Sequence, residues 1–191
     1  MSNKEKINIR FGIITLIIIA ATFSRLIPHP WDYTPIGAIA LFGAAYFSNR
    51  IIAFTIPLVS LWLGDLVMNN TIYSSFHHNK LWLFPTTFPW QYLGFMLITL
   101  LGLVLLKKVK IASVLGSSAI ASVLFFLVSN FGCWLGNITY PQTITGLIAC
   151  YTAGIPFFWN TLAGDLFYCG VLFGLFELAK MKFPILQIQR A

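Results

Sequence analysis

Six long apolar runs, separated by short polar or proline-rich segments, constrain this sequence more than any other feature. Only 9% of its 191 residues are charged, whereas soluble proteins average roughly 25%. So few charges cannot cover a water-facing surface, and runs of this length suit helices that cross a bilayer. We therefore predict an all-α, polytopic membrane protein with a single domain over residues 1–191. The six expected transmembrane spans are Phe11–Ile27, Tyr33–Ser48, Ile51–Met68, Gln91–Leu106, Ile111–Asn130 and Phe157–Ala179.

The positions of lysine and arginine predict how these spans are oriented. Cytoplasmic segments of membrane proteins carry an excess of these residues. With both termini inside, Arg25 and Lys80 are the two basic residues outside, and the other ten are cytoplasmic. A seventh span at Thr143–Phe158 would move the last basic segment outside, so it is not expected. The net charge of +7 therefore indicates a multi-pass protein of the inner (cytoplasmic) membrane, in contact with lipid and not with nucleic acid.

This orientation places three substantial loops on the outer face, at Pro28–Pro35, Asn69–Trp90 and Phe131–Pro156. The inner connections are short, so the molecule is expected to resemble a cup that opens outward. Prolines restrict the backbone of the first loop and discourage helix there. That loop also carries four side chains suited to touching a ligand: His29, Trp31, Asp32 and Tyr33.

Two aspartates, Asp65 and Asp165, lie within the predicted spans. Charges at membrane depth are costly, so they usually face a cavity or a partner. Helical spacing places each on a polar face, and we predict that the two faces line one substrate pocket. The predicted pocket residues on the two spans are Trp62, Asp65, Asn69, Asn160, Thr161, Asp165 and Tyr168. The alternative is structural: each aspartate caps a backbone group or pairs with Arg25 and so holds the bundle together.

The sequence offers little sign of catalysis or of a cofactor. It has no phosphate-binding loop and no nucleophile beside a base, so an enzyme is not expected. The adjacent His77 and His78 suggest no third metal ligand, and the three cysteines, which lack CxxC spacing, are expected to be small buried hydrophobic residues. Aspartates in the pocket would favour a ligand with hydrogen-bond donors or positive charge.

The segment RLIPHPWDYTPIGAIALFGAAYF, which begins at Arg25, resembles a family of small bacterial membrane proteins described as transport proteins. With Leu63-Gly64-Asp65-Leu66 and the six-span plan, the chain is also similar to the substrate-binding S components of energy-coupling factor (ECF) transporters. The resemblance implies a six-helix cup that binds a vitamin or other micronutrient, and partners in the form of a coupling subunit and two ATPases.

S components commonly carry an Ala-x-x-x-Ala patch on the first helix, which docks the coupling subunit. Here the matching residues, Ala40, Ala44 and Ser48, lie on the second predicted span. The resemblance implies a docking role for them, although the same spacing is typical of helix packing within one molecule.

The sequence therefore predicts an outward-facing solute-binding protein, the substrate-capture component of a vitamin or micronutrient importer. Two alternatives stay open: a membrane assembly or scaffold subunit, and a proton-coupled carrier that uses Asp65 and Asp165.

Overall fold

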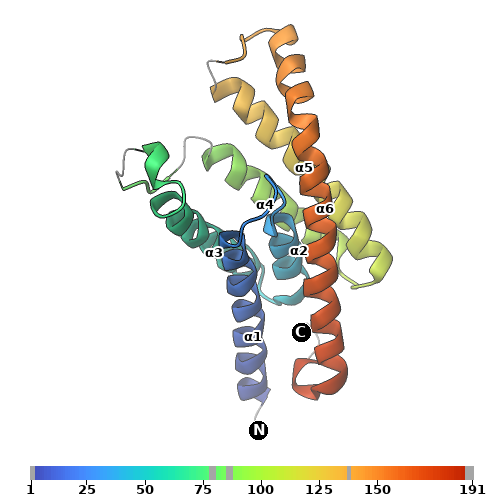
Figure 1. Ribbon diagram of the computed structural model, residues 1–191. Helices are drawn as coiled ribbons and strands as arrows, with labels where there is room; N and C mark the ends of the chain where they lie inside the picture. Colours follow the sequence, from blue (N-terminus) through green and yellow to red (C-terminus); the bar gives the residue numbers. More distant parts are fainter. Residues whose placement is uncertain (1–2, 78–80, 85–87, 137–138, 188–191) are drawn as a thin grey trace.

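The computed structural model describes residues 3–77, 81–84, 88–136 and 139–187, and these residues form helices and connections without a strand. Figure 1 shows the arrangement of the elements. The α-helices are α1 (Asn3–Phe23), α2 (Ile36–Tyr46), α3 (Arg50–Asn70), α4 (Phe88–Leu105), α5 (Ile111–Gly136) and α6 (Ile144–Lys182). Short 3-10 turns follow at η1 (Ser24–Leu26), η2 (Ser74–His77) and η3 (Pro184–Leu186). The prediction of an all-α fold is confirmed for the described residues.

Among the described residues, four helices are long and apolar enough to cross a membrane: residues 5–26, 50–70, 111–136 and 144–182. The helices α2 and α4 are apolar but shorter. The start of α1 and the end of α6 lie at the same end of the bundle, and the hairpin of α5 and α6 projects beyond the other helices at the opposite end (Figure 1).

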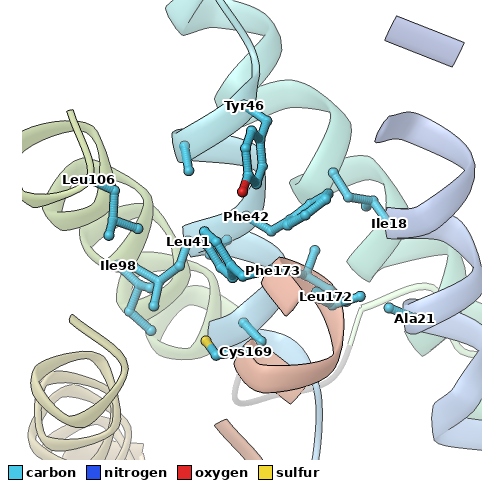
Figure 2. Packing of buried hydrophobic residues seen from close by; sticks show 14 of the residues in the cluster. Ile18, Ala21, Leu41, Phe42, Tyr46, Ile98, Leu106, Cys169, Leu172 and Phe173 are labelled. Atoms are coloured by element: carbon cyan, nitrogen blue, oxygen red, sulfur yellow. The ribbon is translucent and has the colours of Figure 1, made fainter. Parts of the chain in front are cut away.

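Helix α2 is the centre of the bundle. All eleven of its residues are buried, and it packs against α1, α3, α4, α5 and α6. Its Phe42 lies edge-on against Tyr46, Phe173 and Phe176, and Figure 2 shows Phe42, Tyr46 and Phe173 of this cluster where α2 meets α6. A helix surrounded in this way has no polar face, which is why its sequence is apolar on all sides.

Small residues bring the neighbouring helices close to α2. A side chain at Gly43 would come within 2.7 Å of the Pro57 ring on α3, and one at Gly102 on α4 would come within 2.7 Å of the Ala44 methyl group. Ala40 and Ala44 are themselves fully buried. These two alanines therefore pack α2 inside the molecule, and the docking role expected for them stays a prediction; Ser48, just beyond the helix, is exposed.

Charged groups flank both ends of α2. At its carboxyl end, Nη2 of Arg10 donates to the Tyr46 carbonyl at 3.3 Å. At its amino end, the backbone N–H groups of Gly37 and Ala38 donate to the Asp165 carboxylate. A cation at the carboxyl end and an anion at the amino end each complement the helix dipole, so α2 is held electrostatically as well as by packing.

The predicted boundaries are wrong at two places. The connection expected at Phe131–Pro156 is much shorter, because α5 continues to Gly136 and α6 begins at Ile144. Pro156, the last residue of the expected connection, lies inside α6, as proline does in helices whose neighbours satisfy the freed backbone groups. The second run is also shorter than expected, since α2 begins only after Pro35.

Candidate functional site

A cavity of about 310 Å³ lies beside the amino end of α2. Its walls come from η1, the loop before α2, the first turn of α2, and helices α4, α5 and α6. The lining residues are Arg25, Asp32, Thr34, Ile36, Gly37, Trp90, Gln91, Ile98, Phe125, Phe126, Ser129, Asn130, Cys133, Gly154, Phe157, Phe158, Thr161 and Asp165. Segments far apart in the sequence thus contribute to one site of the size of a small ligand pocket.

Arg25 is the basic group of this cavity. Its Nη1 donates to Oδ1 of Asp65 at 2.8 Å, and both side chains are buried. Tyr92 donates from its hydroxyl to the other Asp65 oxygen at 3.2 Å. The Nε of Arg25 is also buried and has no hydrogen-bond partner among the described residues. Arg25 therefore lines the cavity, and its positive charge is neutralised by Asp65, which does not line the cavity.

Asp165 is the acidic group of the cavity wall and is 2% exposed. It accepts a hydrogen bond from Ser122 at 2.7 Å in addition to those from the first turn of α2. The carboxylate lies so close to Gly37 that a side chain at that position would overlap it. Asp165 therefore serves as the amino-terminal cap of α2, supplied by a different helix.

Aromatic rings make up much of the remaining wall: Trp90 from α4, Phe125 and Phe126 from α5, and Phe157 and Phe158 from α6. Phe126 packs edge-on against Phe158, with ring centroids 5.3 Å apart. Four polar side chains lie between the rings, those of Gln91, Ser129, Asn130 and Thr161. Apolar walls with a few placed polar groups are typical of small-molecule sites.

Three of the predicted substrate residues line the cavity: Asp32, Thr161 and Asp165. Asp32 lies in the loop before α2 with a positive φ of 61°. Desolvation raises the pKa of its carboxyl group, and the nearby charge of His29 opposes this shift.

The other predicted substrate residues do not line the cavity. Asn160 donates to the Trp31 carbonyl at 2.9 Å, and Tyr33 packs on Phe167 and Tyr168 with ring centroids 6.0 and 6.1 Å away. These contacts fasten the loop before α2 to α6. The remaining members of the predicted set are His29, Trp62, Asp65 and Asn69, which are half-buried apart from the buried Asp65.

The two predicted aspartates are thus close to one site, but their contacts are those of the structural alternative. Asp65 pairs with Arg25, and Asp165 caps the backbone at the amino end of α2. The sequence reading missed Arg25 as a cavity residue because it treated this arginine as an orientation charge. It missed Ser129 and Asn130 because the fifth predicted span ended at Asn130. The signal that could have found them is that this polar pair lies inside an apolar run that continues beyond it.

Metal coordination has no support in the part of the chain that the structure describes, since no group of three or more His, Cys, Asp or Glu side chains could hold an ion there. His78 lies outside the described residues.

A family model matches residues 5–186, and its description is "Family of unknown function (DUF6580)". The chain belongs to this family. No curated protein and no solved structure matches it. Every residue that lines the cavity lies within the segment that DUF6580 matches, so the cavity belongs to the part of the chain that defines the family.

Proposed function

We propose that this chain is a multi-pass membrane protein of the inner (cytoplasmic) membrane that captures a small solute in an outward-facing cavity. The solute would be a vitamin or similar micronutrient, and the protein would be the substrate-binding component of its importer. The observation that carries this proposal is the 310 Å³ cavity with its aromatic walls and few polar groups.

The proposed topology has six crossings with both termini in the cytoplasm. The start of α1 and the end of α6 lie at one end of the bundle, which supports an even number of crossings (Figure 1), and the excess of lysine and arginine in the predicted inner segments supports the orientation. In this orientation the start of α4 and the end of α5 face outward. Trp90, Asn130 and Cys133 lie at those ends and line the cavity, so the cavity would receive solute from outside.

The contacts of the aspartates change the ligand chemistry that we propose. Both carboxylates already accept hydrogen bonds from the protein, so a cationic ligand has little to gain from them. Arg25 keeps one buried donor, Nε, that has no partner among the residues that the structure describes. A planar, aromatic-rich ligand that presents a carbonyl or other acceptor to Arg25 would suit this site, because leaving a buried donor unpaired costs free energy.

An ECF coupling subunit with its ATPases is the partner that an importer of this kind would need. Its docking surface would lie outside α2, since the small residues of that helix are used within the molecule.

A scaffold role is the second candidate, favoured by one observation on α6. Gly170 and Gly174 are exposed, and a side chain at either would meet open space. Glycines four residues apart on a free face allow close approach of another membrane helix.

Native mass spectrometry of protein gently extracted from its own host tests these functions. We expect a retained small molecule of defined mass, which is lost in Thr161→Trp because the indole would fill the cavity. Thr152→Trp is the matched control: both threonines lie on α6 and donate to the carbonyl four residues earlier, but Thr152 does not line the cavity. Equal retention by both variants would contradict the site, and helical partners without a small molecule would favour the scaffold.

A further inference from the structure

Two of the three cysteines meet at the edge of the cavity. Cys133 lies near the end of α5 and lines the cavity, and Cys150 lies near the start of α6 and is 2% exposed. The Cys133 thiol lies within interaction range of the Cys150 thiol. Cys150 Sγ is also 3.5 Å from the Asn130 carbonyl, to which it donates. All three cysteines are free thiols in the structure.

The hairpin of α5 and α6 holds these two thiols in register. Trp134 Nε1 donates to the Pro141 carbonyl at 3.0 Å, and Gln142 Nε2 donates to the Trp134 carbonyl at 2.6 Å. Below the cysteines, the Tyr151 hydroxyl donates to the Leu127 carbonyl at 2.7 Å. Bonds on both sides of the pair keep the ends of the two helices together, so the hairpin holds the two cysteines near each other.

Whether the two thiols are oxidised depends on the cellular compartment that they face as well as on their geometry. The orientation in the proposed function, on which this step rests, places the hairpin tip outside the cytoplasm. Disulfides form and persist in such oxidising compartments, whereas cytosolic thiols stay reduced. Cys133 can be reached by water through the cavity, while Cys150 is buried behind it, so Cys133 is the thiol that an oxidant would meet first.

We propose that Cys133 and Cys150 are joined by a disulfide in the cell, formed by exchange with an external dithiol oxidant. The Cys133 thiolate attacks the disulfide of the oxidant and releases one of its thiols. The Cys150 thiolate then attacks the Cys133 sulfur and releases the second thiol. The two cysteines lose two protons and two electrons, and the disulfide of the oxidant is reduced to two thiols. The product ties α5 to α6 beside the cavity wall.

Thiol trapping in cells that produce the protein tests this bond. Cells are quenched in acid, free thiols are blocked with N-ethylmaleimide in denaturing detergent, and the protein is reduced and labelled with a polyethylene-glycol maleimide. Wild type should gain two labels after reduction. Cys133→Ser and Cys150→Ser should gain none, because each removes one end of the bond. Cys169→Ser is the matched control and should gain two, since Cys169 lies buried elsewhere on α6.

Wild-type protein that gains no label after reduction would overturn the proposal. Oxidation of purified protein with diamide then tells whether the bond is missing because the pair faces a reducing compartment or because the two cysteines cannot pair. A bond that forms in purified Cys169→Ser but never in cells places the pair in a reducing compartment and contradicts the orientation. A bond that forms in neither contradicts the pairing. Ligand retention in native mass spectrometry is measured independently, so it can stand when the disulfide fails.

Discussion

Arg25 and Asp65 form an ion pair in the interior of the bundle, 2.8 Å apart and shielded from water on both sides. Such a pair contributes little net stability, because desolvation offsets the attraction, but removal of one partner leaves an uncompensated buried charge. The pair therefore acts mainly to hold Arg25 at the cavity wall in one position.

We predict that Asp65→Ala lowers the free energy of unfolding by about 3–5 kcal/mol, the cost of breaking a buried pair. The double variant Arg25→Met with Asp65→Leu should recover much of this loss, because no charge is then left unpaired. Tyr92→Phe, which removes only one hydrogen bond to Asp65, should cost about 1 kcal/mol. Denaturant unfolding in detergent micelles measures all three. A double variant no more stable than Asp65→Ala would contradict the pairing.

Gly37 gives a second prediction at the scale of single residues. A methyl group there would lie 2.8 Å from Cγ of Asp165, so Gly37→Ala should displace the carboxylate that caps α2 and cost about 1–3 kcal/mol. Gly12→Ala is the control, since nothing lies within 4 Å of that position on α1. It should be neutral or stabilising by up to about 1 kcal/mol. The melting temperatures of the two variants in detergent micelles test this prediction, and equal values would show that the Asp165 cap does not contribute to stability.

At the scale of elements, the lengths of α2 and α6 differ most from what a simple bundle of spans would need. The eleven residues of α2 extend only about 16 Å, which is roughly half of a 30 Å hydrocarbon core. Its start, where Asp165 caps it, is therefore expected at membrane depth beneath the loop before α2. A short central helix of this kind creates the space that the cavity occupies.

Helix α6 is longer than a bilayer requires. Its 39 residues extend about 58 Å, so the first turns should project into water on the outer side. We predict that a cysteine at Thr152, in a cysteine-free background, reacts in intact cells with a membrane-impermeant maleimide. A cysteine at Leu175 should not react, although both side chains are exposed in the structure, because lipid would cover Leu175. Labelling of Thr152→Cys only after the cells are permeabilised would reverse the proposed orientation.

For the whole molecule, the helical fold could be predicted because apolar runs and basic residues report directly on helices and their connections. Local patterns also indicated that Asp65 and Asp165 were special. The pairing with Arg25 was open as the structural alternative, but which aspartate takes it, and that Ser122 meets Asp165, depends on packing between helices distant in the sequence. The burial of Ala40 and Ala44 could not be predicted for the same reason: a small-residue pattern does not tell whether the neighbouring helix belongs to the same molecule.

The proposed function depends on one claim about the whole molecule, that the cavity between α4, α5 and α6 holds a solute. An experimental density map of the protein, extracted in its native lipid from its own host, tests this claim most directly. We predict non-protein density between Arg25 and the rings of Phe126 and Phe158, with an acceptor atom facing the arginine. A cavity filled by the protein's own side chains, or by a lipid chain entering from the bilayer, would contradict the account.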